Sequence, residues 1–273
     1  MVTENKPGRI ERLKEYLDKL GKSGKMSLNE AQILHGLLRY SCGFFAGKHL
    51  YQVCSEVVQF MSASAVNKRS NVSSFCNYAS EMLSSGKPRV VSATGEKRPV
   101  LIFTDGSWEG GKSGLGAVVL DSADGFAQIL SGEVPQELIQ LWCRQSGEQI
   151  QIICQIELFA MVVIRWQFQG LLANRRVIWF VDNEAARFST IKGLSATATM
   201  QALVREFFRL ETVCATFPWI ERVPSYSNPS DGASRGSPEE MMHLLGISEC
   251  KRFAPPAALI SNLQQTSRSL RKG

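Results

Sequence analysis

The stretch VLIFTDGSWEGGKSGLGAVVL, residues 100–120, decides the fold class of this 273-residue chain. It opens with VLIFTD, a short apolar run with β-branched and aromatic side chains, which predicts a buried strand. LGAVVL, residues 115–120, predicts a second strand, and a turn signal ending in Asp-Gly leads to a third, FAQILSG, residues 126–132. Together the three runs predict an antiparallel meander.

Helical and strand patterns alternate after the meander. Residues 134–150 are expected to be irregular or partly helical, and residues from about 153 to 170 predict a long apolar helix. RRVIWFVD at 175–182 and FPWIERVP at 217–224 predict a fourth and a fifth strand. Further helices are predicted for residues 183–193, 197–213 and 237–246. The order βββ-α-β-α-α-β-α predicts an α/β fold with a mixed five-stranded sheet and flanking helices.

The pattern changes once along the chain, after its first third. The N-terminal part shows only helical periodicity, and Ser27 with Glu30 predicts a capping box at the start of its second helix. A segment of Gly, Pro, Ser and charged residues without sustained period then predicts a linker. The expected organisation is an α-helical unit at 1–86, a linker at 87–98, an α/β domain at 99–250 and a loose polar tail at 251–273.

Composition limits the class of protein. The chain is 44% hydrophobic and 21% charged, which is ordinary for a globular protein, and no apolar run reaches the ~18 residues of a membrane span. The polar N-terminus lacks a signal-peptide pattern, so we expect a cytoplasmic or nuclear protein with no membrane partner. Seven scattered cysteines without a CxxC pair predict reduced thiols and not a zinc site or disulfides.

The net charge of +6 is unevenly spread. Residues 1–98 hold 15 Lys and Arg against 8 Asp and Glu, whereas residues 99–273 hold 16 against 17. This basic first third indicates an arm or platform that binds phosphate groups. The alternative is a soluble surface with a chance excess of lysine.

Three carboxylates stand where chemistry is expected. Glu157 lies in a helix that is apolar nearly all round, where a charge is costly unless it meets a cation. Asp105 and Asp182 each end a predicted strand, and parallel neighbouring strands would bring them to one sheet edge, where ligands bind in open α/β sheets. The structural alternatives are a Glu157–Arg pair at a solvated helix start and aspartates that cap helices or turns.

A fourth carboxylate, Asp231, follows the last predicted strand in SNPSDGASRG and can reach the same edge. Its structural alternative is a turn followed by a helix start. Four carboxylates in one place either stay partly protonated or bind metal. Hard oxygen ligands suit Mg²⁺ or Mn²⁺, and two such ions about 4 Å apart support phosphodiester cleavage.

These segments resemble the ribonuclease H family, over residues of about 99–246. FTDGSWEGGKSGLGAVVL, with Asp105, is similar to the first hairpin of ribonuclease H domains, and IELFAMVV, with Glu157, resembles the family's glutamate helix. WFVDN, with Asp182, resembles its fourth strand. NPSDGASRG, with Asp231, is similar to the Asn-Pro-x-Asp-x-x-Ser-Arg segment of ribonuclease H domains linked to reverse transcriptases. The order Asp, Glu, Asp, Asp is that of the family.

The helical unit resembles the segment between polymerase and ribonuclease H in retroelement reverse transcriptases. The matching Ala-x-x-Leu-x-Gly-x-Leu core is Ala31, Leu34, Gly36 and Leu38. This resemblance implies a piece of a retroelement polyprotein whose partner is an upstream reverse transcriptase. The chain has no Tyr-x-Asp-Asp motif, so polymerase activity is not expected.

The resemblance implies hydrolysis of the RNA strand of RNA–DNA hybrids with two Mg²⁺ or Mn²⁺ ions. Asp105, Asp182 and Asp231 would hold one ion, and Asp105 and Glu157 the other. No His occurs between Asp182 and Asp231, where many active members carry a loop His that assists product release, so slow turnover is expected.

Nucleic-acid contacts are expected beside the carboxylates. The backbone at Gly106 and Ser107, together with Asn183, is placed to meet 2′-hydroxyls, and Asn228 lies in the Asn-Pro-x-Asp segment. Candidate phosphate contacts, each also explicable as an ordinary surface charge, are Arg175, Arg176, Arg187, Lys192, Arg205 and Arg209.

Other functions on the same fold stay open. Asp105-Gly106-Ser107 argues against a 3′–5′ exonuclease, which has Asp-x-Glu there, and an acidic set that ends in Asp231 argues against a transposase or integrase. A junction resolvase shares the acidic chemistry. The remaining alternatives are a non-catalytic nucleic-acid-binding module and a degenerate retroelement remnant.

Overall fold

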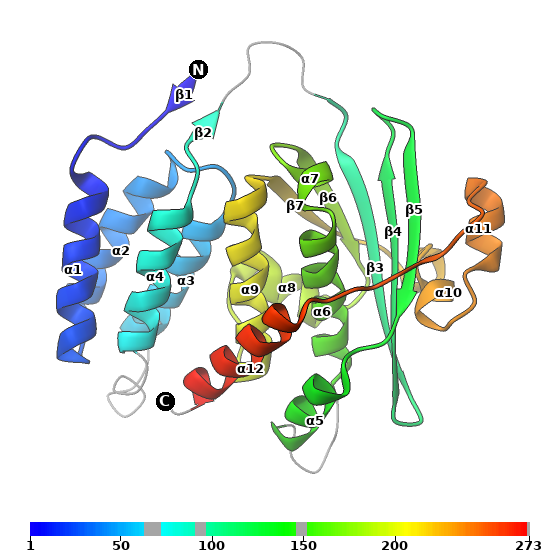
Figure 1. Ribbon diagram of the computed structural model, residues 1–273. Helices are drawn as coiled ribbons and strands as arrows, with labels where there is room; N and C mark the ends of the chain where they lie inside the picture. Colours follow the sequence, from blue (N-terminus) through cyan, green and yellow to red (C-terminus); the bar gives the residue numbers. More distant parts are fainter. Residues whose placement is uncertain (63–71, 91–96, 146–151, 272–273) are drawn as a thin grey trace.

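A bundle of helices and a mixed β-sheet lie side by side in the computed structural model of the chain (Figure 1). The structure describes residues 1–62, 72–90, 97–145 and 152–271. The N-terminal helices form one side of the molecule, and the sheet with its own helices forms the other. The last helix runs back along the sheet side toward the N-terminal bundle.

The sheet has six strands in the order β7-β6-β3-β4-β5-β8. Their bounds are β3 Val100–Glu109, β4 Lys112–Asp121, β5 Phe126–Gly132, β6 Arg176–Val181, β7 Phe217–Arg222 and β8 Lys251–Arg252. β3, β4 and β5 form the predicted antiparallel meander, and β6 runs parallel to both β3 and β7. The predicted α/β fold with a mixed sheet is therefore confirmed, and the short β8, parallel to β5, adds a strand that was not predicted.

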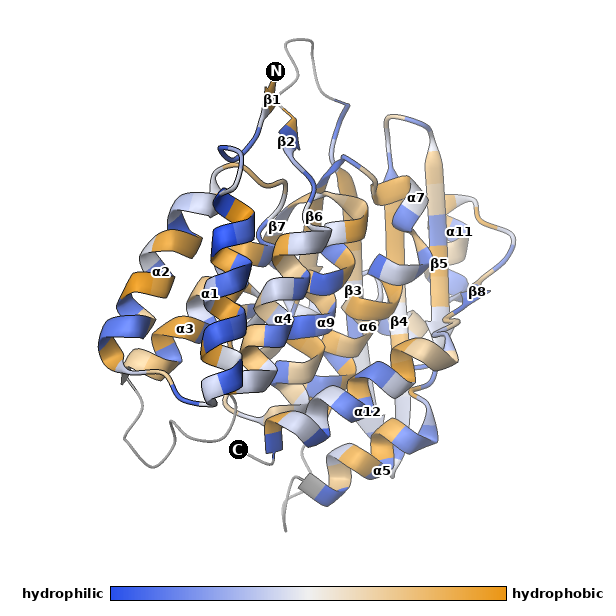
Figure 2. Ribbon diagram, turned by 60° about the vertical axis from the view of Figure 1, so that its left-hand side comes forward, coloured by the Kyte–Doolittle hydropathy of each residue, from blue (hydrophilic) through white to orange (hydrophobic). Residues whose placement is uncertain are grey.

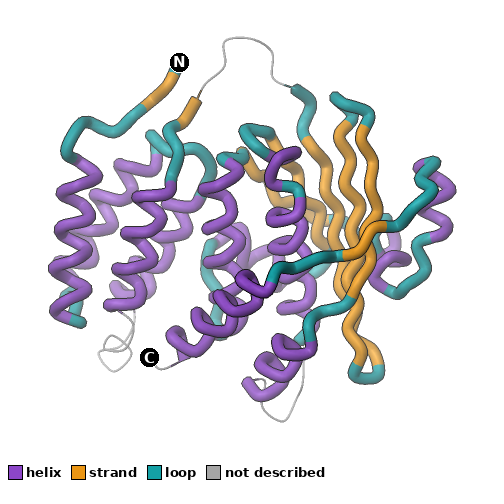
Figure 3. The backbone as a smooth tube through the Cα atoms, viewed as in Figure 1, coloured by secondary structure: helices purple, strands orange, loops and turns teal. Residues whose placement is uncertain are grey.

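Helices pack on both faces of this sheet (Figure 3). On one face, α6 (Ile153–Gln167) contacts β3 and β4, and it also packs on α9 (Ala198–Cys214). On the other face, α10 (Asp231–Ser234) and α11 (Glu239–Leu245) cover part of the meander through a small cluster around Val118 and Ile129. The remaining elements of this part of the chain are α5 Gln136–Gln145, α7 Gln169–Leu172, α8 Glu184–Lys192, the 3-10 turn Ser225–Ser227 and α12 Ala257–Arg271.

The helical unit consists of four helices: α1 Arg9–Ser23, α2 Leu28–Cys42, α3 His49–Ser62 and α4 Val72–Ser85. Polar and apolar faces alternate around them, as Figure 2 shows, and the apolar faces enclose a core that includes Leu17, Leu34 and Phe75. The predicted capping box is confirmed, because the Ser27 hydroxyl accepts from the Glu30 backbone N–H while the Glu30 carboxylate accepts from the Ser27 backbone N–H. A two-residue pairing of β1 (Val2–Thr3) with β2 (Arg89–Val90) lies at one end of the unit.

Buried polar contacts join the helical unit to α9. Arg205 in α9 forms an ion pair with Glu56 in α3, and both side chains are nearly inaccessible to solvent. The same carboxylate accepts a hydrogen bond of 2.8 Å from the Gln201 side chain. Gln52 donates to the Gly193 carbonyl at the end of α8, at 3.2 Å. These contacts hold α3 against the α8–α9 connection.

The predicted loose tail is wrong. Residues 257–271 form α12, whose Leu259 and Leu263 are buried against the main core. These two leucines are spaced by four residues and share one helical face, which the polar composition of the segment had obscured. The far end of α12 reaches the helical unit, where the Ser269 and Ser74 hydroxyls lie 2.9 Å apart.

Other predicted boundaries differ in detail. The single helix expected at about 153–170 is divided at Phe168 into α6 and α7. The partly helical segment is helix α5 up to residue 145, and residues 146–151 lie outside the described residues. Residues 91–96, the middle of the predicted linker, also lie outside them, and the division into domains stays a prediction. Among the described residues, no helix combines the length and apolar character needed to cross a bilayer.

Removal of one partner of the Glu56–Arg205 pair is expected to destabilise the protein. Arg205→Met leaves the Glu56 carboxylate buried without its cation, so we expect the free energy of unfolding to fall by about 3–5 kcal/mol in chemical denaturation. The double variant Glu56→Leu, Arg205→Met should lose less stability than the single variant, because it leaves no buried charge unpaired. Lys22→Ala, which breaks an exposed pair with Asp18, is the control and should change stability by about 0.5 kcal/mol or less. A single variant as stable as this control would contradict the prediction.

Candidate active site

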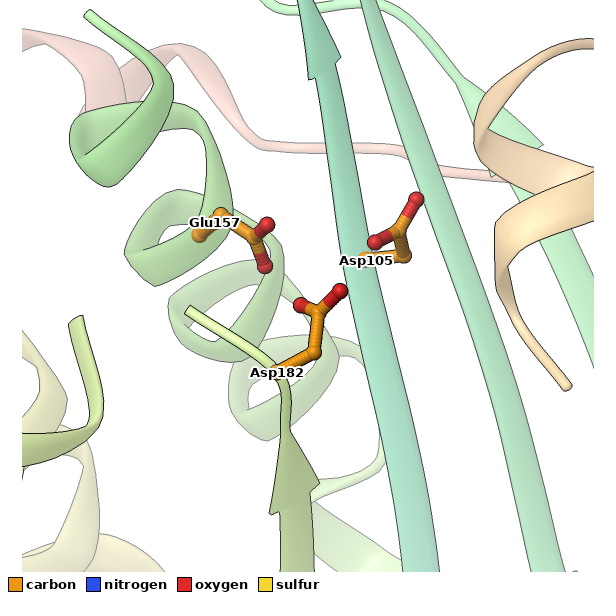
Figure 4. A group of neighbouring side chains, drawn as sticks. All are labelled: Asp105, Glu157 and Asp182. Atoms are coloured by element: carbon orange, nitrogen blue, oxygen red, sulfur yellow. The ribbon is translucent and has the colours of Figure 1, made fainter. Parts of the chain in front are cut away.

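Three carboxylates converge at the carboxyl end of β6, beside the middle of the neighbouring strand β3 (Figure 4). Asp105 comes from β3, Glu157 from the first turns of α6, and Asp182 from the residue after β6. One carboxylate oxygen of each lies within 4.8 Å of the others, so the three form a possible metal-binding group. We call this group the acidic triad. The parallel pairing of β3 with β6, in which Thr104 is opposite Val181, is what brings the two aspartates together.

Two members of the acidic triad are buried, and the third, Asp182, is half-buried. Asp105 and Glu157 are each 3% exposed. One oxygen of Glu157, Oε2, and one of Asp182, Oδ1, have no hydrogen-bond partner among the described residues. Buried polar atoms without partners are rare in folded proteins and call for a ligand, a water or an ion. The predicted alternative of a Glu157–Arg pair is absent from the described residues.

Burial and the charges of neighbouring carboxylates favour the protonated forms of Asp105 and Glu157. Desolvation raises the pKa of Asp105 from 3.8 to about 6, with smaller increases from the charges of Asp182 and Asp231, against a lowering hydrogen bond from Ser234. Desolvation likewise raises the pKa of Glu157 well above its ordinary value, and Asp182 and Asp105 raise it further. The Gly106 backbone hydrogen bond lowers it only in part. A bound cation would reverse this balance by favouring the charged forms.

A glycine permits the contact between β3 and α6. A Cβ atom at Gly106 would lie 2.8 Å from Ile156 Cγ2 and 3.0 Å from the backbone nitrogen of Glu157. No side chain fits in that space without movement of the helix. Gly106 therefore allows the strand and the helix to approach closely enough for Asp105 and Glu157 to share one site.

Asp182 is not the helix cap that was its structural alternative. The N-cap of α8 is Asn183, whose side-chain oxygen accepts from the Ala186 backbone N–H at 2.9 Å. Asp105 is not a cap either, since β3 does not end there but continues to Glu109, with Asp105 opposite Gly116 of β4. Both aspartates are thus left available to the site.

Asp231 lies beside the acidic triad but is not part of it. It is the first residue of α10, its side chain is 41% exposed, and its two oxygens accept from Arg235 Nε at 3.0 and 3.2 Å. Ser234 links it to the triad, because its hydroxyl contacts both the Asp105 carboxylate and the Asp231 carbonyl. Of the four predicted ligands, three are brought together by the structure and the fourth stands next to them.

Two glycines of β4 let α10 approach the site. A Cβ at Gly114 would lie 1.8 Å from the Ser234 carbonyl oxygen, and one at Gly116 would lie 2.3 Å from the Ser230 carbonyl oxygen. Sequence reasoning missed both these glycines and the role of Ser234. The alternation Gly-x-Gly in a strand that is otherwise apolar was the available signal, since such a pattern often marks close backbone approach.

The residues predicted to contact nucleic acid have other tasks in this structure. The Ser107 hydroxyl donates to the Ser234 carbonyl at 2.8 Å, and Asn183 caps α8. Asn228 is buried, with its amide nitrogen donating to the Thr104 carbonyl at 3.1 Å and its oxygen accepting from Ser230. Asn228 therefore fixes the loop before α10 to the end of β3, and its side chain faces the protein.

Four of the predicted phosphate contacts are committed to ion pairs. Arg205 is buried against Glu56, and Arg209 pairs with Glu81 and Glu206. Arg175 pairs with the buried Asp121 at 2.7 Å, and Arg187 pairs with Glu184 at 3.2 Å. The prediction is wrong for Arg205, because a guanidinium enclosed at a helix interface cannot meet a nucleic acid. Such long-range pairing leaves no mark in the local sequence.

Comparisons with known proteins find likeness in structure only. No model of a known protein family matches the sequence, and a search of curated proteins finds no match. The chain is similar to RNase H1 from the halophilic archaeon Halobacterium salinarum NRC-1, with 15% identity and a TM-score of 0.38 over 52% of this chain and 99% of that one. It is also similar to the N-terminal RNase H domain of rv2228c from Mycobacterium tuberculosis, with 15% identity and a TM-score of 0.37 over 54% of this chain and 97% of that one. What the strand order above establishes is an α/β fold with a mixed sheet and flanking helices.

The raised pKa of Asp105 has a measurable consequence for stability without metal. A carboxyl group whose pKa is higher in the folded than in the unfolded state contributes stability at low pH and loses it as the pH rises, here between 3.8 and about 6. Asp105→Asn should therefore raise the free energy of unfolding at pH 7.5, in EDTA, by about 1–3 kcal/mol. The gain should vanish near pH 4, where the native carboxyl is also neutral.

Two comparisons make this pH prediction strict. Asp124→Asn, which neutralises an exposed carboxylate paired with Lys97, should give no gain at pH 7.5. Mg²⁺ or Mn²⁺ should raise the thermal midpoint of the native protein more than that of Asp105→Asn. A variant that is less stable than the native protein at pH 7.5 in EDTA would contradict the assignment of Asp105 to a strained, desolvated site.

Proposed function

We propose that this chain is a metal-dependent endonuclease that hydrolyses the RNA strand of RNA–DNA hybrids. The observation that carries the proposal is the acidic triad, in which Glu157 Oε2 and Asp182 Oδ1 are buried without hydrogen-bond partners. Three carboxylates in one place, two of them buried, are unfavourable for a structural role and are explained by cation binding. The order of the acidic residues, with Asp231 as the last, agrees with the family resemblance of the sequence.

The residues present fit divalent ions with a preference for oxygen ligands. Asp105, Glu157 and Asp182 offer only carboxylate oxygens, which suit Mg²⁺ or Mn²⁺ and not softer metals. In the proposed site, Asp105 would be a ligand of both ions. Asp231 would complete the ligand set. Two divalent ions bound there would supply a water of lowered pKa and stabilise negative charge on the departing 3′ oxygen.

The chain's own residues would orient the substrate and the ligands. Ser234 holds the Asp105 carboxylate in place, and Gly106 presents backbone groups beside the acidic triad. We propose that the backbone at Gly106 and Ser107, with the free amide nitrogen of Asn183, meets 2′-hydroxyls of the RNA strand. Asn228 would act indirectly, through the loop that carries Asp231.

We also propose that the chain derives from a retroelement reverse transcriptase and works with an upstream polymerase. The support is the Ala-x-x-Leu-x-Gly-x-Leu segment in α2. Ala31, Leu34 and Leu38 of this segment lie in the core of the helical unit. Their roles in packing are consistent with a unit that is retained because it folds against the nuclease part.

A cleavage assay tests the nuclease proposal. With a labelled RNA–DNA hybrid and Mg²⁺ or Mn²⁺, only the RNA strand should be cut, and EDTA should abolish cleavage. Asp182→Asn should lower the rate by about 100-fold or more, because a ligand that stabilises charge in the transition state is lost. Asp124→Asn, a matched substitution of an exposed carboxylate in the turn between β4 and β5, should cut at the native rate.

The substrate panel separates the alternatives. Cleavage of four-way DNA junctions but not hybrids would replace the proposal with a junction resolvase. Hybrid binding without cleavage in either metal would replace it with a non-catalytic binding module.

A further inference from the structure

The fourth carboxylate, Asp231, is paired with an arginine and lies outside the acidic triad. Arg235 Nε lies 3.0 and 3.2 Å from the two oxygens of Asp231, and Arg235 Nη1 contacts the Glu109 carboxylate at the end of β3. The guanidinium thus bridges two carboxylates, one from α10 and one from the β3–β4 hairpin. Asp231 can join the triad only if it leaves this bridge.

The bridge is weak enough to be exchanged. The side chains of Arg235 and Asp231 are 51% and 41% exposed, and ion pairs of this kind contribute little net stability in water. The acidic triad, by contrast, is buried and contains the unpartnered Oε2 of Glu157. A cation in the triad and an arginine outside it therefore compete for the same Asp231 carboxylate.

Arg235 also lines a groove in which a ligand could contact it. The guanidinium lines a groove of about 890 Å³ that begins at Ser107 and Ser234, next to Asp105. The groove is of mixed charge: its other lining cations are Lys112, Lys251 and Arg252, and its acidic residues are Glu109, Glu133 and Glu239. Among the described residues, Lys112 and Arg252 make no ion pair, so they are available to an anion.

A phosphodiester backbone is the ligand that fits this arrangement. Arginine binds phosphate through two parallel hydrogen bonds, as it does carboxylate, so a phosphate entering the groove can replace Asp231 as its partner. Lys112 and Arg252 would attract the same backbone by charge. Once its arginine is engaged elsewhere, Asp231 has no cation left except one bound at the acidic triad.

We propose that Arg235 is a positioning residue that holds Asp231 outside the metal site until the nucleic-acid backbone in the groove takes the guanidinium. This inference rests on the proposed function for the identity of the ligand. It makes assembly of the full four-carboxylate set dependent on bound nucleic acid. In its absence, Asp105, Glu157 and Asp182 bind metal without help from Asp231.

Metal binding, and not activity, is the direct test. Mn²⁺ bound to the full chain is measured by electron paramagnetic resonance, with and without a hybrid whose 2′-fluoro RNA strand resists cleavage. Two Mn²⁺ ions are expected, and the test concerns the one bound with lower affinity. Without nucleic acid, the Arg235→Gln variant should bind this ion about threefold to fivefold more tightly than the native chain does, because Asp231 is released. The hybrid should tighten this site in the native chain and have a smaller effect in Arg235→Gln.

Two control variants isolate the effect. Arg222→Gln removes another exposed arginine, one that pairs with Glu184 and does not contact Asp231, and should leave Mn²⁺ affinity unchanged. Asp231→Asn combined with Arg235→Gln should abolish the gain of the single variant. Thermal midpoints measured in EDTA confirm that each variant is folded.

The outcomes separate this inference from the proposed function. Equal Mn²⁺ affinity of the native chain and Arg235→Gln without nucleic acid would overturn the role of Arg235, even if hybrids are bound and cut. A native chain that binds no hybrid would refute the proposed substrate. The comparison of Mn²⁺ affinities would still test whether Arg235 restrains Asp231.

Discussion

The site depends on one contact, the approach of β3 to the first turn of α6 at Gly106. A side chain there would collide with Ile156 and with the backbone of Glu157. The helix is held in place by its own burial, since residues 155–165 are all removed from solvent. Hydrophobic packing therefore brings the carboxylates together, although their charges repel one another.

This arrangement places carboxylates where their charges repel one another, a conflict that a bound cation would relieve. Two carboxyl groups that are almost fully buried, with pKa values raised by desolvation, are costly where no ion is bound. Violations of this kind concentrate at functional sites, because the rest of the fold supplies the stability to support them. The contacts of Ser234 with Asp105 and of Asn228 with Thr104 show that neighbouring loops are built around the same group.

Much of the sheet, and the convergence of Asp105, Glu157 and Asp182, could be predicted from the sequence. Asp105 and Asp182 follow apolar runs that are recognisable as strands, and the structure pairs these two strands in parallel. The extension of β3 to Glu109 was not predictable from GSWE, which is not apolar and gains its pairing from β4. The Asp231–Arg235 pair and the burial of Arg205 depend on contacts between segments that local patterns do not encode.

Helix α9 packs between the helical unit, which belongs to the basic first third of the chain, and the sheet that carries the acidic triad. One side of α9 lies in the sheet core, where Phe207 packs edge-on against Trp179, and another carries Arg205 toward Glu56 of α3. Glu211 of the same helix accepts a hydrogen bond of 2.6 Å from the Lys48 backbone while it pairs with the buried Arg165. Buried polar contacts tolerate little change of geometry, because each lost partner leaves an unsatisfied charge. The helical unit is thus held at a set position relative to the sheet that carries the acidic triad.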